Sequence, residues 1–201
     1  MKRLIIALFL TALINPALRA ENVTAEDRDK AIDYLKQTRD EVLRATKGLS
    51  EAQWNFKPAP DRWSVAEVTE HIAAAEDFLR MRLQNDIMKA PPRTGAEDIK
   101  ALDELVLKAI PDRSKKAQAP EPLRPTNRFD SPKESLKHFQ DSRAQTIVFL
   151  KKTKDLREHA ADSPLGKKLD GYQWVLFIAA HSERHTKQIN EVKADPGFPK
   201  D

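Results

Sequence analysis

The sequence predicts an all-α protein built as a four-helix bundle. Charged residues make up 33% of the chain and aromatic residues only 6%, which suits long helices that bury one apolar stripe and expose the rest. Four long segments repeat apolar residues at spacings of three and four, as bundle helices do. Residues that cap helices stand before these segments. The length of 201 residues is within the range of one domain.

The first bundle helix is predicted over residues 25–47. Thr24 can cap its start, and Gly48 follows its end, where a left-handed residue often stops a helix. Its inner positions step by four and three along the chain: Ala31, Leu35, Thr38, Val42, Ala45 and Leu49. This spacing is typical of a bundle seam.

The second bundle helix is predicted from Ser64 to about Lys89. Ser64 and Glu67 have the spacing of a capping box, in which each side chain accepts the free backbone N–H of the other residue. Trp63 precedes the cap and is expected to staple the entry to the helix. The inner face is formed by Val65, Val68, Ile72, Ala75 and Leu79.

The third and fourth bundle helices are predicted over residues 131–154 and 170–193. Ser131 caps the third helix and is followed by a proline, which is tolerated at the first helical position. Asp170 and Gln173 begin the fourth helix. No stretch alternates apolar and polar residues as a half-buried strand does, so no sheet is expected.

Residues 90–130 are predicted to form a long crossover connection between the bundle halves. A short helix over residues 97–110 interrupts an otherwise irregular, mobile segment. Bundles with one long crossover are a known topology. Six prolines deny the segment a continuous helix: Pro91, Pro92, Pro111, Pro120, Pro122 and Pro125.

Residues 1–20 have the layout of a secretory signal peptide. Lys2 and Arg3 precede the apolar run Leu4–Leu13, and Ala20 can close the segment. An uncleaved membrane anchor is the alternative, although the run is short for a transmembrane span. We therefore expect a mature four-helix-bundle domain over residues 21–201, periplasmic or secreted, with no stable membrane insertion after cleavage.

Charge and cysteine content exclude several classes of function. Removing the three basic residues of the signal segment leaves 32 basic against 31 acidic residues, so the mature chain is nearly neutral. No basic stripe with interleaved aromatics remains, and nucleic-acid binding is not expected. The chain has no cysteine. It therefore lacks disulfides and thiolate ligands, and any metal site must use histidines and carboxylates.

The fourth helix carries two histidines on its inner stripe, which is formed by Trp174, Ile178, His181, His185, Gln188 and Val192. Residues four apart face the same side of a helix. The imidazoles of His181 and His185 can therefore take adjacent positions on one metal ion. An i,i+4 pair also arises by chance, so spacing alone leaves the metal site and a chance pair equally open.

His71 leans toward the apolar side of the second helix, three residues after Val68 and four before Ala75. The small Ala74 and Ala75 would leave space beside it. With His181 and His185 it could hold zinc, nickel or cobalt, and three protein ligands leave positions open for water or substrate. The alternative is a core histidine hydrogen-bonded to a backbone carbonyl. Because protonated imidazole cannot ligate, we expect binding to weaken as pH falls through about 6.5.

Other polar residues receive simpler interpretations. Gln188 shares the histidine stripe and is expected either to orient His185 or to be a buried amide between helices. Glu183 is one position away from where a zincin-type base would stand, and is read as a solvated acid. Nothing in their spacing places His138 or His159 at the site.

At these residues the sequence resembles the DinB-like (DinB/YfiT) superfamily. The resemblance rests on Trp63-Ser64-Val65-Ala66-Glu67 leading into His71, and on Asp170-Gly171-Tyr172-Gln173-Trp174 leading into His181, His185 and Gln188. It covers roughly residues 25–193. It implies a four-helix bundle of DinB type whose histidine triad binds nickel or zinc, with one ligand from the second helix and two from the last.

The resemblance also implies two functions. Relatives include thiol S-transferases and proposed metal-dependent hydrolases, so one hypothesis is a metal-dependent enzyme acting on an unidentified small molecule. Low-molecular-weight thiols are cytosolic, so the export signal makes thiol transfer less natural. The alternative is a non-catalytic exported metal-binding or stress-related protein, which the lack of an evident general base favours. Dimers occur in the family, so a homodimer is one assembly to test.

Overall fold

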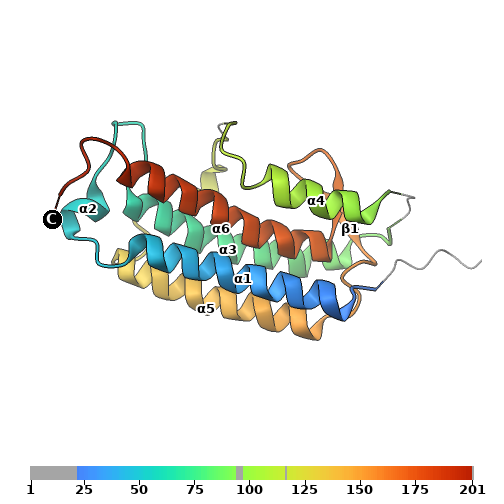
Figure 1. The fold of residues 1–201 in the computed structure, drawn as a ribbon. Helices are drawn as coiled ribbons and strands as arrows, with labels where there is room; N and C mark the ends of the chain where they lie inside the picture. Colours follow the sequence, from blue (N-terminus) through green and yellow to red (C-terminus); the bar gives the residue numbers. More distant parts are fainter. Residues whose placement is uncertain (1–21, 94–96, 116, 201) are drawn as a thin grey trace, which may run out of the picture.

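The computed structural model describes residues 22–93, 97–115 and 117–200, and within them it confirms an all-α four-helix bundle (Figure 1). The bundle helices are α1 (Ala25–Thr46), α3 (Val65–Asn85), α5 (Pro132–Lys152) and α6 (Gly171–Lys193). The predicted signal peptide over residues 1–20 lies outside the described residues. Among the helices of the described part, none has both the length and the apolar character that a membrane span requires.

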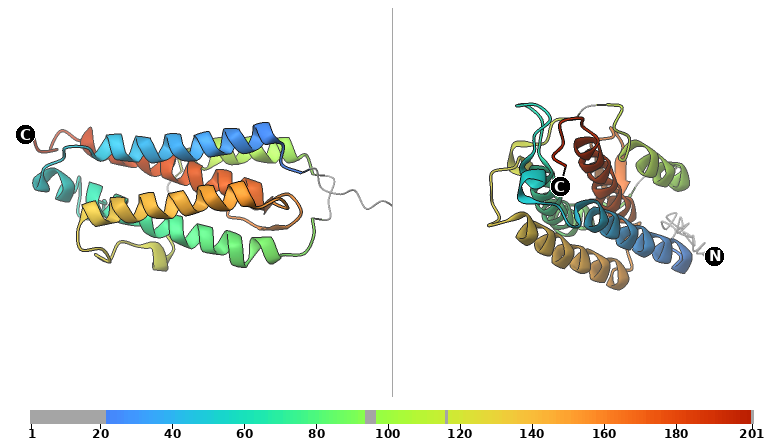
Figure 2. Two further views of the ribbon diagram at one scale, coloured as in Figure 1. Left: turned by 90° about the horizontal axis from the view of Figure 1, so that it is seen from below. Right: turned by 60° about the vertical axis from the view of Figure 1, so that its left-hand side comes forward.

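The order of the helices around the bundle differs from their order along the chain. Helix α1 packs against α5 and α6, and α3 packs against the same two helices, so α1 and α3 stand at opposite corners. Helices α1 and α6 run in one direction and α3 and α5 in the other (Figures 1 and 2). Because α3 and α5 are parallel, the chain between them must return along the whole length of the bundle.

Caps define the helix starts, and they match the predictions closely. Thr24 accepts the backbone N–H of Asp27, and Ser64 forms the complete capping box with Glu67. Ser131 caps α5, and Asp170 forms a second box with Gln173 at the start of α6. Each side chain satisfies a backbone N–H that has no partner inside its helix.

Two short elements were not expected. Helix α2 (Glu51–Asn55) follows α1, and a two-stranded antiparallel hairpin, β1 (Ala160–Asp162) and β2 (Lys168–Asp170), precedes α6. The prediction of no sheet was therefore wrong. Strands of three residues are too short for an apolar–polar alternation to stand out. The turn between them uses Gly166 at φ 68°, a conformation that glycine adopts without strain.

The crossover connection between α3 and α5 is partly structured. It contains two 3₁₀ turns, η1 (Ile87–Lys89) and η2 (Glu121–Leu123), and the helix α4 (Ile99–Ala109). Helix α4 packs along the start of α6, and its Val106 is fully buried there. The predicted mobility of this segment stays a prediction, whereas its course as a long crossover is confirmed.

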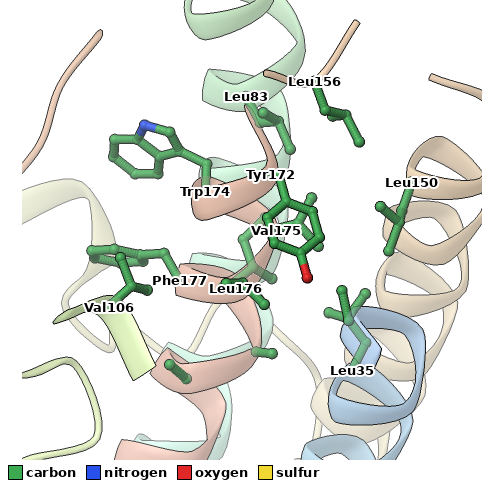
Figure 3. Packing of buried hydrophobic residues seen from close by; sticks show 14 of the residues in the cluster. Leu35, Leu83, Val106, Leu150, Leu156, Tyr172, Trp174, Val175, Leu176 and Phe177 are labelled. Atoms are coloured by element: carbon green, nitrogen blue, oxygen red, sulfur yellow. The ribbon is translucent and has the colours of Figure 1, made fainter. Parts of the chain in front are cut away.

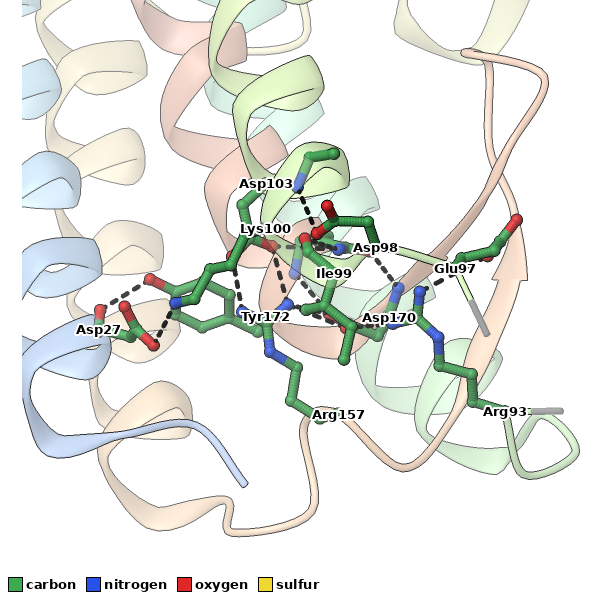
Figure 4. A network of polar contacts seen from close by, with 12 residues as sticks. Asp27, Arg93, Glu97, Asp98, Ile99, Lys100, Asp103, Arg157, Asp170 and Tyr172 are labelled. Atoms are coloured by element: carbon green, nitrogen blue, oxygen red, sulfur yellow. Dashed lines mark hydrogen bonds and ion pairs between the residues drawn. The ribbon is translucent and has the colours of Figure 1, made fainter. Parts of the chain in front are cut away.

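A polar network anchors α4 and the hairpin to the start of α6 (Figure 4). The guanidinium of Arg157 lies 2.7 Å from Asp103 of α4 and 2.9 Å from the capping residue Asp170. Arg93 donates to the same Asp170 at 3.0 Å. A Cβ on Gly171 would lie 2.9 Å from the carbonyl oxygen of Leu156, so only glycine fits there. The Asp-Gly-Tyr-Gln-Trp motif therefore has a structural role.

The core consists of two apolar clusters, one at each end of the bundle. The cluster around the start of α6 contains Leu35, Leu83, Leu150 and Trp174 (Figure 3), and the cluster at the other end contains Val42, Phe139 and Val192. Between them, each helix contributes buried polar residues. We call these the polar layer: Thr38 of α1, Glu76 of α3, Arg143 and Thr146 of α5 and Ser182 of α6.

Arg143 joins all four helices within the polar layer. Its side chain has no exposed surface, and its Nε and Nη2 donate to the two carboxylate oxygens of Glu76 at 2.8 and 2.7 Å. Nη1 donates to the Leu35 carbonyl and the Thr38 hydroxyl, and Nη2 also donates to Ser182. All five guanidinium N–H donors therefore have acceptors, which is what a buried arginine requires.

Candidate metal centre

The three predicted histidines meet where α3 passes α6. Nε2 of His185 lies 3.2 Å from Nε2 of His71 and 3.2 Å from Nε2 of His181. One nitrogen from each ring falls within 4.8 Å of the other two. His71 and His185 are buried and His181 is partly exposed. The structure thus brings together all three sequence-predicted residues from two antiparallel helices.

Backbone contact fixes the tautomer of His71. Its Nδ1 lies 2.8 Å from the carbonyl oxygen of Leu123, in the crossover connection. A carbonyl can only accept a hydrogen bond, so the ring proton of a neutral His71 is on Nδ1. Its Nε2 then carries a bare lone pair that is directed at the other histidines.

Gln188 and Arg113 fix the tautomer of His185 in the same way. Gln188 Oε1 lies 2.8 Å from His185 Nδ1 and accepts from Arg113 Nη1 at 3.3 Å. Because arginine only donates, the amide oxygen of Gln188 must face it, and that oxygen then accepts from His185 Nδ1–H. Gln188 therefore lies where it orients His185, as the sequence suggested.

Two bare nitrogen atoms face one another as a result. His71 Nε2 and His185 Nε2 are 3.2 Å apart, yet neither carries a hydrogen to share. Such a pair repels unless a cation lies between the atoms. Tetrahedral coordination with bonds of about 2.0–2.1 Å places two imidazole nitrogens roughly 3.3–3.4 Å apart. The donor set and its spacing therefore fit a late transition metal ion.

Burial keeps the three imidazoles neutral. Desolvation lowers the pKa of His71 below its ordinary 6.5, although the bond to Leu123 opposes this. The pKa values of His181 and His185 are lowered further, first by burial and then by the charge each ring would feel from its neighbouring histidines. The imidazoles should therefore stay deprotonated at pH values somewhat below 6.5, the ordinary pKa of an exposed histidine, so the expected weakening of metal binding moves to a lower pH than the sequence alone suggested.

This arrangement predicts how the stability of the metal-free protein varies with pH. Below about pH 6.5 the unfolded chain binds protons at these histidines while the folded chain does not. The free energy of unfolding should therefore fall as pH drops from about 6.5 toward the lowered pKa values, and it gains nothing further above 6.5. Urea unfolding in chelator at pH 7.5, 6.5 and 5.5 measures this.

The matched control combines His71→Gln, His181→Gln and His185→Gln, and it keeps His138 and His159 as they are in the wild type. The control should lose less stability than the wild type between pH 6.5 and 5.5. Equal losses in the two proteins would contradict the lowered pKa values.

The walls of the site differ from what the sequence suggested. The space expected beside Ala74 and Ala75 is filled by the side chain of Leu123, which forms a small apolar cluster with these two alanines. Trp63 does more than close the helix entry, since its ring centroid lies 5.0 Å from that of His71. The site is thus lined on one side by the crossover connection.

The remaining candidates lie elsewhere. Glu183 accepts from the Tyr34 hydroxyl at 2.5 Å and pairs with Lys187, so it faces α1 and is not the simply solvated acid expected. His138 contacts Asp77 on the surface between α3 and α5. His159 Nδ1 lies 2.6 Å from the Ala90 carbonyl. Neither belongs to the triad of His71, His181 and His185, and His159 instead lies in a separate group with Asp155 and Glu158.

Two contributors to the site were missed by reasoning from sequence. Leu123 contacts His71 through its backbone carbonyl, so the identity of its side chain does not indicate that it orients the histidine. Arg113 lies 75 residues before Gln188 in the chain, in the proline-rich connection, and no local pattern links the two. Only the return path of the crossover brings them to α3 and α6.

Comparisons with known proteins agree with this architecture. The chain is 29% identical over 163 residues to YuaE, an uncharacterised protein of Bacillus subtilis, covering 81% of this chain and 96% of YuaE. Its fold is similar to that of YfiT from Bacillus subtilis, described as a probable metal-dependent hydrolase with an unusual four-helix bundle topology. That match has a TM-score of 0.55 at 19% identity and covers 89% of this chain and 93% of YfiT. The model of the DinB superfamily matches residues 34–189, and the chain therefore belongs to the DinB superfamily.

Proposed function

We propose that this protein binds one divalent transition metal ion, zinc or nickel, through His71, His181 and His185, and that it is a metal-dependent enzyme of hydrolase type acting on a small molecule. The observation that carries the proposal is the pair of bare Nε2 atoms 3.2 Å apart, each fixed by an acceptor on the opposite side of its ring. A divalent cation resolves that repulsion.

Two further facts support the proposal. Neutral imidazole favours late first-row metals over magnesium or calcium, and no thiolate is available to compete. YfiT, whose fold is similar, is described as a probable metal-dependent hydrolase. Hydrolysis is preferred over thiol transfer because we also propose that residues 1–20 direct export of the mature chain, away from cytosolic thiols.

The roles of the protein groups follow from their positions. When bound, the ion would supply Lewis-acid chemistry that makes water a better nucleophile at neutral pH. Leu123 and Gln188 hold two of the imidazole rings in the ligating tautomer. With three protein ligands, coordination positions remain for water and substrate.

A second function is favoured by one observation. Glu183, the acid between the two ligands of α6, bonds to Tyr34 and Lys187 and does not face the triad. Apart from the histidines themselves, the hydrogen-bond and ring partners of the triad among the described residues are the carbonyl of Leu123, the amide of Gln188 and the indole of Trp63, and none of these is an acid or base at neutral pH. A non-catalytic metal-binding protein remains the alternative.

Elemental analysis tests the metal site. The purified protein should contain about one divalent ion per chain, and His71→Ala, His181→Ala and His185→Ala should each lose it. His138→Ala is the matched control and should keep the metal. If the variant lacking all three histidines retained stoichiometric metal, the site assignment would be wrong.

Activity separates the two candidate functions. A panel of ester, amide and phosphoester substrates is assayed with the metal-loaded protein, with and without chelator. Hydrolysis that chelator removes and His181→Ala abolishes supports the enzyme. Stoichiometric metal binding with no turnover on the whole panel supports the non-catalytic alternative.

A further inference from the structure

The carbonyl that holds His71 belongs to a segment outside the bundle. Leu123 ends the 3₁₀ turn η2 in the crossover connection, 52 residues after His71 in the chain. The position of His71 on α3 is set by bundle packing, whereas the position of the Leu123 carbonyl depends on a segment that folds back onto α3. The Leu123 side chain packs against Ala74 and Ala75 of α3, and polar contacts add to this packing in holding residues 121–128, which we call the carbonyl loop.

Glu70 fixes the carbonyl loop from α3. Its carboxylate accepts the backbone N–H groups of three consecutive residues, Thr126 at 2.7 Å, Asn127 at 3.0 Å and Arg128 at 3.3 Å. Asn127 has φ 58°, a left-handed conformation that turns these N–H groups toward one acceptor. The Glu70 side chain is only 7% exposed. Buried bonds of this kind, with a charged acceptor, are among the stronger ones in proteins.

Arg128 extends the contact to the residues on either side of Leu123. Its Nε lies 3.1 Å from Glu70, Nη1 donates to the Pro122 carbonyl at 3.1 Å and Nη2 donates to the Arg124 carbonyl at 2.6 Å. These contacts therefore connect Glu70 of α3, through Arg128 and the Leu123 carbonyl, to His71, which is the next residue of α3.

We propose that Glu70 is a positioning residue for the metal centre, acting on His71 through Arg128 and the Leu123 carbonyl. This inference rests on the proposed metal-binding function and adds a residue to it. Without the carboxylate, the carbonyl loop loses its acceptor, and the ring of His71 loses the partner that keeps its Nε2 bare and aimed at His185. Groups that orient ligands typically contribute 10–100-fold to metal affinity.

The test is Glu70→Gln, which keeps the volume but places an amide NH₂ among donors that need an acceptor. Zinc and cobalt dissociation constants are measured by competition with a chromophoric chelator. We expect the dissociation constants to rise about 10–100-fold. We also expect the visible spectrum of the cobalt-loaded variant to differ from that of the cobalt-loaded wild type, which a purely structural role for Glu70 would not cause.

The matched control is Glu67→Gln on the same helix, where the carboxylate caps Ser64 and contacts Lys57 rather than the carbonyl loop. It should lower thermal stability slightly and leave the cobalt spectrum and metal affinity unchanged. Arg128→Lys is a second variant, which keeps the charge but loses the fork to Pro122 and Arg124. It should weaken metal binding in the same direction, and it covers the case in which Glu70→Gln fails to fold.

Failure of this inference differs from failure of the proposed function. If the wild type binds metal through the three histidines while Glu70→Gln and Arg128→Lys bind it with wild-type affinity and spectrum, the positioning role is wrong and the metal site stands. If the wild type binds no metal, the proposed function itself is wrong, and with it the role of Glu70.

Discussion

Replacing Arg143 with methionine is expected to destabilise the fold by about 3–5 kcal/mol, the usual cost of removing one partner from a buried ion pair. The change leaves the Glu76 carboxylate buried without its bidentate partner, and leaves Leu35, Thr38 and Ser182 without their donor. The free energy of unfolding is measured by urea denaturation followed by circular dichroism at pH 7.5 in chelator.

The double variant Arg143→Met with Glu76→Leu provides the control. It removes both charges, so it should recover much of the loss of the single variant, because an apolar pair needs no partner in the interior. A single variant that loses less than about 1 kcal/mol, typical of an exposed pair, would contradict the buried position of Arg143.

Metal binding should produce the second large effect. An ion that binds only the folded chain adds about 2.7 kcal/mol at a free concentration one hundred times its dissociation constant. For a chain of this length such a gain raises the melting temperature by about 5–10 °C. Differential scanning calorimetry with zinc and with chelator measures the difference.

Single substitutions locate the origin of this gain. His181→Ala and His185→Ala should each abolish most of the rise in melting temperature on adding zinc. His138→Ala should keep it, since His138 pairs with Asp77 away from the triad. A zinc-dependent rise that persists undiminished in His181→Ala would mean that the ion binds elsewhere.

The fold was predictable because the bundle helices carry their own start signals. Ser64 with Glu67 and Asp170 with Gln173 fix two helix starts by local hydrogen bonds, which depend only on residues three apart. Apolar spacing then identified the buried faces. The hairpin around Gly166 was missed because its strands are too short to show a period.

The site was predictable only where a helix dictates it. His181 and His185 are one turn apart, so the helix itself places their rings together. The resemblance to the DinB superfamily supplied His71. The contacts of Leu123 and Glu70 depend on how residues 121–128 fold back onto α3, over a sequence separation of more than fifty residues. No local pattern encodes such a return.

The polar layer also sets the axial register of the bundle. A slip of α5 by one helical turn would carry the Arg143 guanidinium about 5.4 Å along the bundle axis. That movement would take it out of reach of Glu76 and Ser182 and toward an apolar cluster, where its charge would have no partner. Apolar seams alone tolerate such shifts, whereas a buried polar contact selects one alignment. Because Ser182 directly follows His181, the same alignment brings α6 to the height at which its histidines meet His71.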